Sequence, residues 1–470
     1  MNFDPREFRE QSRAALADPG LKMALSRLKT HFALGRAKAV ARYGGDWEEL
    51  REHGRAIRDH AVTHLDTLLE TFERNVVAQG GHVHWARDAA EARDIVLAIL
   101  READARKVIK GKSMVSEEIG LNPFLEANGI APIETDLGEY IVQLRREPPS
   151  HIIAPAFHLN KEDVADTFRA AHADLDPQRH LVERTELVGE ARRVLRAQFE
   201  TADAGITGAN FLTAQEGAGI LVTNEGNGDL SRLLPKTHIV VTGIEKVVAN
   251  LDDAAVLLRL LTRSATGQDI SSYVTVMLGP RRTGESDGPE NFHVVLVDNG
   301  RTRLIGTEAE ETLRCIRCAA CLNHCPVYAA VGGHAYGATY QGPIGAALNP
   351  NLMGIAAAHH HPKASTFCGR CAEVCPVKIP LPKIMRHWRA REYASGLAPK
   401  PAVMGLSLWA FAAKRPKLYR ALASTAARAL HAIARDGRVH SLPLLLGWFA
   451  VRDLPAPQGK TFTQIWNERQ

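Results

Sequence analysis

The cysteines of this 470-residue chain constrain its fold and chemistry more than any other feature, because all seven lie within one short stretch. The first four form the run CIRCAACLNHCP, whose spacing and closing proline are those of a bacterial ferredoxin motif. The other three stand in CGRCAEVCP, which repeats the final part of that run. The pattern predicts two iron–sulfur clusters, held by Cys315, Cys318, Cys321, Cys325, Cys368, Cys371 and Cys375.

Each cluster is expected to take ligands from both motifs, because the fourth cysteine of such a run ligates the other cluster in two-cluster ferredoxins. Cluster 1 is therefore assigned Cys315, Cys318, Cys321 and Cys375. Cluster 2 is assigned Cys325, Cys368 and Cys371. We expect two [4Fe–4S] clusters, the second of which is one cysteine short.

Ser365 stands where a complete second motif would carry its first cysteine, three residues before Cys368. A serine oxygen is a harder and less common ligand for iron than a thiolate. Four interpretations of the fourth ligand position of cluster 2, called its open corner below, stay open. The position can be filled by Ser365, by another protein group or by water, or it can be vacant in a [3Fe–4S] cluster. The histidines at 359–361 are candidates because imidazoles can replace thiolates on iron, although a solvated histidine loop is the simpler interpretation.

Structural zinc and disulfide bonds are the alternative uses of these cysteines. Zinc sites usually take a self-contained set of four ligands, which a four-cysteine run with a truncated repeat fits poorly. The first residues, MNFDPREFREQSRAAL, contain no apolar stretch of the kind found in secretory signals. We therefore expect a cytoplasmic protein, whose thiols stay reduced and available to metal.

Charge and hydropathy argue against two further classes of protein. The formal net charge is +5, and Lys and Arg are spread along the chain rather than gathered in a stripe, which gives no support for nucleic-acid binding. Apolar runs such as MGLSLWAFAA and LPLLLGWFAV fall well short of the ~20 residues that cross a bilayer. We expect no transmembrane segment.

The length predicts about three domains, and the pattern along the chain indicates four segments. Residues 1–75 have apolar positions at helical spacing. Residues 76–306 alternate helical stretches with short β-rich runs (HVHWA, YIVQL, HIIAP, GILVTN, HIVVTG, YVTVML and FHVVLV), which predicts an α/β domain around a largely parallel sheet. Residues 307–395 hold the cysteine motifs in a helical, ferredoxin-like domain, and residues 396–470 are interpreted as a helical docking segment.

Two segments of the α/β region indicate a ligand cleft. Lys110 and Lys112 lie in KGKS, between a strand-like and a helix-like run, where a turn could present cations and helix-terminal N–H groups to an anion. The segment GITGANFLTAQEGAGILVTNEGNGDLSR places glycines around Glu216, Asn224 and Glu225. Glycines at strand ends commonly mark close approach of a ligand or of the chain itself.

Arg281 is a further candidate anion contact, because it follows the strand-like run YVTVML in a loop. Each of these candidates has a plain alternative. The KGKS segment can be a basic surface turn, the glycine-rich segment can be purely architectural, and Arg281 can be a solvated charge.

These motifs together resemble the lactate utilisation protein B family, the iron–sulfur subunits of bacterial lactate-utilisation systems. In the cysteine region the resemblance rests on CIRCAACLNHCPVY, GGHAYGATYQGPIGAALNP and STFCGRCAEVCPVKIPLP. In the α/β region, KGKSMVSEEIGLN, SHIIAPAFHLNKEDV and GPRRTGESDGPENFHVVLVDNGR resemble the lactate-utilisation (LUD) domain. The segment GWFAVRDLPAPQGKTF is similar to the C-terminal part of the same family.

The resemblance implies a cytoplasmic component of a three-subunit system that oxidises L-lactate to pyruvate, with two [4Fe–4S] clusters in this chain. The partners are then the other subunits of that complex. It also implies that the middle domain has a fold similar to the sugar-phosphate isomerase and CoA-transferase superfamily.

Three functions are consistent with the sequence. In the first, the chain relays electrons while the assembled complex oxidises its substrate, so that the chain alone is not catalytic. In the second, the LUD-like domain binds a ligand or transfers an acyl group, with Glu216 or Glu225 as its carboxylate and the clusters structural. In the third, the relay serves another 2-hydroxy acid or a heterodisulfide. The sequence identifies neither the catalytic residues nor the electron acceptor.

Overall fold

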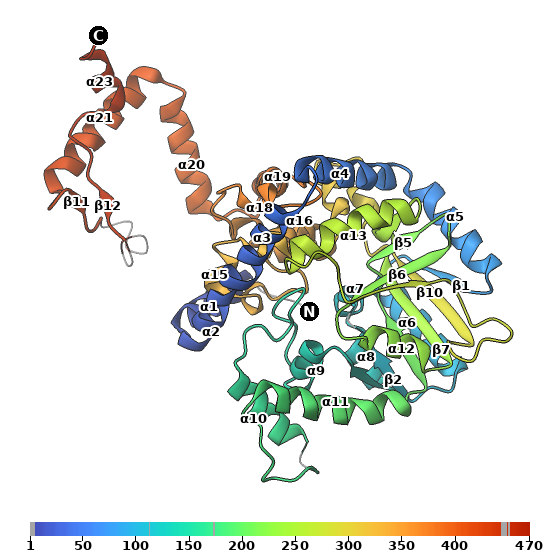
Figure 1. Cartoon of the computed structure of the whole chain (residues 1–470). Coiled ribbons are helices and arrows are strands. Elements are labelled where there is room, and N and C mark those ends of the chain that lie inside the picture. The colour runs from blue at the N-terminus through green and yellow to red at the C-terminus, as the bar shows by residue number, and fades with distance from the viewer. Residues whose placement is uncertain (1–4, 112, 173, 443–448, 450–451) are drawn as a thin grey trace. The chain divides into compact units, whose positions relative to one another are not determined.

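The computed structural model describes residues 5–111, 113–172, 174–442, 449 and 452–470. The chain forms two compact units, Met1–Glu392 and Tyr393–Gln470. The larger unit contains the α/β region and the cysteine motifs, and the smaller one contains the C-terminal helices (Figure 1).

A six-stranded parallel sheet forms the centre of the larger unit. Its strand order is β1-β10-β7-β4-β2-β3, and every neighbouring pair is parallel. In that order the strands are His82–Ala86, Asn291–Val297, Thr237–Gly243, Ala204–Thr207, Lys107–Lys110 and Ala131–Glu134. This confirms the α/β domain around a parallel sheet that the alternating pattern predicts.

Helices cover both faces of this sheet, because successive residues of its central strands enter different cores (Figure 1). In β7, Ile239 and Val241 belong to the core that contains α6 (Ala89–Glu102), whereas Val240 belongs to the core that contains α5 (Leu65–Ala78). Every residue of β7 is buried. Burial on both sides explains why the centre of this strand is continuously apolar rather than alternating.

One of the β-rich runs, YIVQL, is helical and not a strand. It forms most of α9 (Leu137–Leu144), which begins where Asp136 Oδ1 accepts hydrogen bonds from the N–H groups of Gly138 at 3.0 Å and Glu139 at 3.1 Å. A good N-cap and a buried stripe therefore outweigh the β-branched residues. The run HIIAP is also not a strand, since residues 151–155 form a loop.

The remaining helices of the α/β region lie between and after its strands. They are α7 (Met114–Glu118), α8 (Leu121–Ala127), α10 (Lys161–Ala171), α11 (Arg184–Glu200), α12 (Asn227–Leu233), the short 3-10 helix η2 (Ile244–Lys246) and α13 (Leu251–Ala265).

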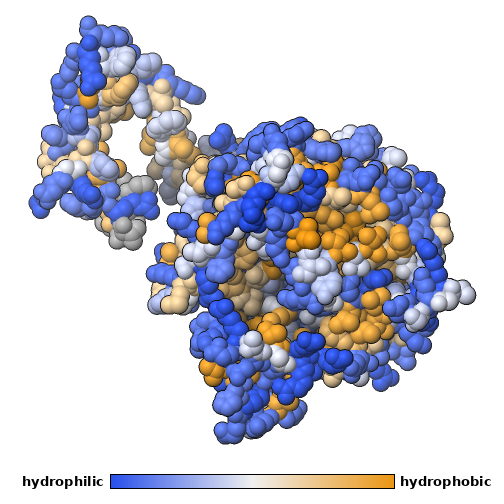
Figure 2. All heavy atoms as spheres, in the orientation of Figure 1, coloured by the Kyte–Doolittle hydropathy of each residue, from blue (hydrophilic) through white to orange (hydrophobic). Residues whose placement is uncertain are grey.

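A second, four-stranded sheet has the order β8-β5-β6-β9. Its strands are Val247–Val248, Phe211–Thr213, Ala218–Thr223 and Tyr273–Met277 in that order. The runs GILVTN and YVTVML thus pair with each other, antiparallel, outside the parallel sheet. The β5–β6 hairpin closes at Gly217, whose φ of +60° favours glycine. Figure 2 shows hydrophobic residues gathered on the face of the larger unit where Figure 1 places α13, β5 and β6.

The N-terminal helices share one core with α13 and the cysteine region. That core contains Leu25, Leu28, Leu50 and Ile57 together with Cys318. The elements concerned are α1 (Pro5–Ala17), α2 (Pro19–Arg27), the π-helical η1 (Leu28–Ala33), α3 (Leu34–Arg42) and α4 (Trp47–Thr63). Packing of this kind places the start of the chain against the cysteine motifs.

Short helices build the cysteine region, as a ferredoxin-like segment predicts. They are η3 (Thr302–Leu304), η4 (Glu310–Arg314), α14 (Ala320–Asn323), α15 (Tyr328–Val331), η5 (His334–Tyr336), α16 (Gly342–Leu352), α17 (Ile355–Ala358), η6 (His361–Lys363), α18 (Arg370–Glu373) and α19 (Leu381–Ala394).

The smaller unit is mainly helical. Its described elements are α20 (Lys400–Ala413), α21 (Pro416–Ile433), α23 (Phe462–Asn467) and a two-stranded antiparallel ribbon of β11 (Arg438–Val439) and β12 (Leu454–Pro455). Across the described parts of the chain, no helix combines the length and the apolarity that crossing a bilayer requires.

Candidate iron–sulfur centres and ligand cavity

Four of the seven free cysteines converge inside the larger unit. Cys315, Cys318, Cys321 and Cys375 line one small cavity. Burial raises the pKa of Cys321 well above its ordinary value, and the neighbouring thiolates of Cys315, Cys318 and Cys375 raise it further. Burial likewise raises the pKa of Cys375 to about 11. These four residues are called the buried group below.

The other three cysteines form a second group, called the surface group, which consists of Cys325, Cys368 and Cys371. Burial raises the pKa of Cys371 to about 12, and Cys325 and Cys368 add to the shift. Burial also raises the pKa of Cys325, with Cys368 as its neighbouring thiolate. Cys368 is exposed, whereas Cys325 and Cys371 are buried, so this group reaches the surface.

The backbone repeats its conformation around the two motifs. Arg317 and Ala319, which flank Cys318, have φ values of +60° and +59°. Phe367 and Gly369, which flank Cys368, have φ values of +54° and +83°. Such left-handed conformations are uncommon outside glycine, so their recurrence at matching positions shows that both loops have the same local fold.

The repeat places Ser365 at the position of Cys315. The N–H of Arg317 donates to Cys315 Sγ at 3.4 Å. In the second loop, the N–H of Phe367 donates to Ser365 Oγ at 3.1 Å. The serine oxygen therefore accepts the hydrogen bond that the sulfur accepts in the first loop.

The donor set fits iron–sulfur clusters. Thiolates this close together repel one another in a buried space, which together with burial raises the pKa of Cys321 and of Cys371 and favours their protonated forms in the absence of a cation. Iron supplies the positive charge that lets thiolates share a site, and hydrogen bonds from backbone N–H groups to sulfur are typical of such loops. Ile379 N–H donates one to Cys375 Sγ at 3.4 Å.

Arginines from the N-terminal helices hold the end of the second motif. Arg51 Nη2 donates to the carbonyl oxygens of Glu373 at 2.7 Å and Cys375 at 2.8 Å. Arg36 Nη2 donates to the carbonyl of Val374 at 3.2 Å. The two guanidinium groups bring positive charge close to the buried group, where an iron–sulfur cluster with four thiolates carries net negative charge.

A buried network of charges joins the parallel sheet to the cysteine region, and sequence reasoning missed it. Arg301 donates to Glu118 at 2.8 Å and to Glu245 at 2.5 Å. Tyr340 donates to Glu118 at 2.7 Å, and Arg317 pairs with Glu245 at 3.2 Å. Burial alone raises the pKa of Glu245, but Arg301 and Arg317 outweigh it and lower that pKa to about 2. Its members are far apart in the sequence, which gave no signal of it.

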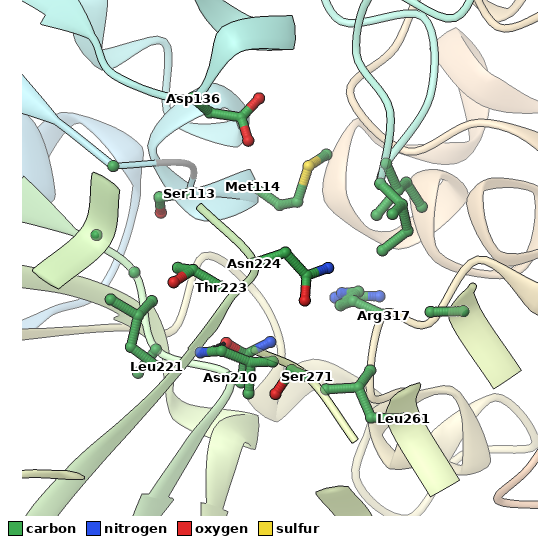
Figure 3. A pocket seen from close by; sticks show the side chains of 18 of the residues that line it. Ser113, Met114, Asp136, Asn210, Leu221, Thr223, Asn224, Leu261, Ser271 and Arg317 are labelled. Carbon is green, nitrogen blue, oxygen red and sulfur yellow. Dashed lines mark hydrogen bonds between the residues drawn. The ribbon is translucent and has the colours of Figure 1, made fainter. Parts of the chain in front are cut away.

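A cavity of about 270 Å³ opens beside this network. Gly111, Gly208 and Thr242 lie on its wall at the carboxyl ends of β2, β4 and β7, the edge of a parallel sheet where ligands usually bind. Its polar lining includes Asp136, Asn210, Asn224, Lys246, Ser271 and Arg317. In Figure 3, the labelled Asp136, Asn210, Asn224 and Ser271 come from the α/β region and Arg317 comes from the cysteine region.

Two of the predicted cleft residues, Asn224 and Glu225, line this cavity. Asn224 Nδ2 donates to Gln268 Oε1 at 3.1 Å, and Asn224 Oδ1 accepts from the N–H of Ser272 at 3.0 Å. The amide is thereby held at the cavity wall (Figure 3).

Three of the other predicted cleft residues lie elsewhere. Lys110 is buried at the end of β2 and pairs with Glu134 at 2.6 Å. Glu216 lies at the β5–β6 turn, and Arg281 pairs with Glu290 at 2.8 Å in the β9–β10 loop. Lys112 lies outside the described residues. Among the described residues, Lys110, Glu216 and Arg281 are therefore not part of the cavity lining.

The histidines of the run 359–361 contact other parts of the larger unit. His359 Nδ1 lies 2.8 Å from Glu392. His361 Nδ1 lies 3.0 Å from Asn349 Nδ2, and His361 Nε2 lies 2.7 Å from the carbonyl of Tyr336. Both ring nitrogens of His361 are thus occupied by protein groups, which explains its burial.

Comparisons with known proteins agree with this architecture. Residues 69–297 match the LUD domain family, residues 311–379 the 4Fe-4S dicluster domain family, and residues 391–470 the family described as lactate utilisation protein B, C-terminal. Lactate utilization protein B of Bacillus velezensis is 42% identical over 473 residues, covering 100% of this chain and 98% of the relative. The chain belongs to the lactate utilization protein B family.

Other members of the lactate utilization protein B family are equally similar. The protein of that name from Geobacillus thermodenitrificans is 46% identical over 432 residues, covering 91% of this chain and 89% of the relative. The Bacillus subtilis protein is 42% identical over 473 residues. A crystal structure of a DUF162 family protein from Deinococcus radiodurans aligns with 50% of this chain and 98% of that chain, at 16% identity and a TM-score of 0.29.

Proposed function

We propose that this chain is the electron-relay subunit of a cytoplasmic complex that oxidises L-lactate to pyruvate. The observation that carries the proposal is the pairing of a buried cysteine group, which lies beside a cavity, with a second group that reaches the surface. The names of the relatives, all lactate utilization protein B, favour lactate as the substrate over glycolate or a heterodisulfide.

The chain's own residues would hold two [4Fe–4S] clusters in crossed fashion. The buried group supplies all four ligands of cluster 1. The surface group supplies three ligands of cluster 2. An iron–sulfur cluster, when bound, takes up and releases electrons singly. Oxidation of lactate to pyruvate releases two electrons and two protons, so a chain with two such sites suits delivery of the electrons to a one-electron acceptor.

Ser365 is the candidate for the fourth ligand of cluster 2. Its Oγ occupies the position of Cys315 Sγ in the repeated loop and accepts the equivalent backbone hydrogen bond. Because an oxygen ligand suits iron less well than a thiolate, this corner is expected to be the labile one. Loss of its iron would leave a [3Fe–4S] cluster.

The smaller unit is proposed to dock the chain on its partner subunits. Within this unit α20 has no buried residue. Its exposed apolar side chains are Met404, Leu406, Leu408, Trp409 and Phe411. Five large apolar side chains on one exposed helix are typical of a surface that another protein covers.

The test is to isolate the chain from its native host without oxygen, together with whatever binds it. We expect lactate to reduce the clusters in this complex, as seen by EPR, and glycolate to do so more slowly. The chain purified alone should show no lactate oxidation with an artificial acceptor. Lactate oxidation by the chain alone, or lack of cluster reduction in the complex, would overturn the proposal.

A further inference from the structure

The cavity beside the buried cysteine group has a cationic end. Lys246, at the end of η2, and Arg317, between Cys315 and Cys318, both line it. Arg317 and Ile152 also line the small cavity that holds the buried group, so the two spaces share a wall. The cationic end is thus formed where the α/β region, with Lys246, meets the first cysteine loop, with Arg317.

Both cations have hydrogen-bonding capacity that the described residues leave unused. Lys246 is 7% exposed, and no described residue accepts a hydrogen bond from its Nζ. The side chain of Arg317 is 9% exposed, and while Nη2 donates to Glu245, the buried Nη1 has no partner among the described residues. Buried donors normally have an acceptor. Arg317 Nη1 is such a donor, and the ammonium group of Lys246 lines the same cavity, so an anion bound there would find two cations.

The size of the cavity and its opposite wall restrict the anion. At about 270 Å³ the cavity is slightly smaller than most ligand sites, which hold roughly 300–1,000 Å³, so it suits a small ligand. Asn210, Asn224 and Ser271 also line the cavity (Figure 3), and each makes hydrogen bonds to the protein but keeps the capacity for one more, to a polar substituent. Asp136 lies at another side of the cavity (Figure 3), where its carboxylate would repel a second negative charge on the ligand.

We propose that this cavity binds a short monocarboxylic acid with a 2-hydroxy or 2-oxo group, its carboxylate between Lys246 and Arg317. The carboxylate accepts hydrogen bonds from both cations, and the 2-hydroxy or 2-oxo group faces Asn210, Asn224 and Ser271. The identification of the acid class rests on the proposed function, whereas the anion site rests on the two cations alone. The bound acid lies next to the buried group, at the inner end of the proposed relay.

The test is binding of L-lactate and pyruvate to the full chain, reconstituted with iron and sulfide without oxygen and titrated by calorimetry. We expect both acids to bind, and malate, a dicarboxylate, to bind more weakly. Lys246→Met should weaken pyruvate binding about tenfold or more, because a hydrogen bond to a charged group is lost. The matched control is Lys236→Met, at a lysine whose side chain is 78% exposed. Equal affinity of Lys246→Met and wild type would overturn the proposal.

A second variant keeps the proposal testable if Lys246→Met does not fold. Asp136→Asn keeps the N-cap of α9, since asparagine caps helices as well as aspartate does, but removes the charge. It should bind malate more tightly than wild type does. Unchanged selectivity between malate and pyruvate would contradict the assigned orientation.

A third readout is the reduction potential of cluster 1. An added negative charge beside the buried group should lower it, so saturating pyruvate should shift the EPR-monitored titration of that cluster but leave cluster 2 nearly unchanged. No shift at saturation would contradict the location. If the holo chain binds no acid while the complex still oxidises lactate, the proposed acid site is wrong but the proposed electron-relay function is not contradicted. If the acid binds but lactate does not reduce the clusters of the complex, the proposed electron-relay function is wrong but the acid site is supported.

Discussion

The two cysteine groups of this chain are built from the same loop repeated, yet their surroundings differ. The buried group has four cysteines, lies under the arginines of α3 and α4, and shares a wall with the ligand cavity. The surface group has three cysteines, and its Cys368 is exposed. Since the local fold is the same, the difference comes from what packs around each loop. On the proposed function, the buried group is the end of the relay that faces the substrate and the surface group is the end that faces a partner.

The largest expected effect is the loss of a whole cluster after substitution of a cysteine in the motif that does not hold most of its ligands. Cys375→Ala should destroy cluster 1 although Cys375 stands in the second motif, because its thiol converges with the other three of the buried group. Cys325→Ala is the matched variant and should remove cluster 2 instead. Iron content and EPR spectra distinguish the two. If each variant loses the cluster of its own motif, the crossed assignment is wrong.

Ser365→Cys should make the two groups alike. Cluster 2 should then survive exposure to air severalfold longer than in the wild type, since a thiolate is the preferred ligand of this iron. Thr366→Cys, one residue away at an exposed position, is the control and should give no such gain. The measurement is the growth of the [3Fe–4S] EPR signal with time in air. Equal lability of wild type and Ser365→Cys would mean that another group holds the corner.

Glu245 should make the free energy of unfolding of the larger unit fall at acid pH. Its folded-state pKa of about 2 lies below the ordinary value of 4.5 because Arg301 and Arg317 outweigh the effect of burial. The carboxylate therefore stabilises the fold fully above pH 4.5, and about 3 kcal/mol is lost as the pH falls from 4.5 towards 2. Urea unfolding between pH 6 and pH 3 should show a flatter acid limb in Glu245→Gln. An identical pH dependence would contradict the assignment.

Arg51→Met should destabilise the second motif by about 2 kcal/mol, because the guanidinium donates to two buried carbonyl groups of that motif. Arg55→Met on the same helix is the control: its partners Glu52 and Asp59 lie on that helix, and its side chain is 36% exposed. The control should change the free energy of unfolding by less than about 0.5 kcal/mol. Urea unfolding measures the change in the free energy of unfolding for both variants. Equal changes would show that the hydrogen bonds of Arg51 to the second motif do not stabilise the fold.

The cysteine groups could be predicted from the sequence because ligand spacing in a loop is a local property. The cavity could not, since its wall joins residues near 111, 246 and 317 that only the fold brings together. Lys110 illustrates the limit. In the sequence it resembles an exposed anion contact, but in the sheet it pairs in register with Glu134 of the neighbouring strand, which neutralises its charge. A single sequence does not reveal which strands are neighbours.

The contacts of Arg51 have a consequence for how the protein is made. This arginine lies near the start of the chain, but the carbonyl groups to which it donates belong to residues more than three hundred positions further along the sequence. On the crossed assignment, cluster 1 lacks a ligand until Cys375 has been synthesised and cluster 2 until Cys371 has been synthesised. At ordinary rates roughly 3–12 s pass between synthesis of Cys315 and Cys375. During that interval the first four thiols stand unmetallated on a nascent chain. On that assignment, iron and sulfide can fill both sites only after both motifs have been translated.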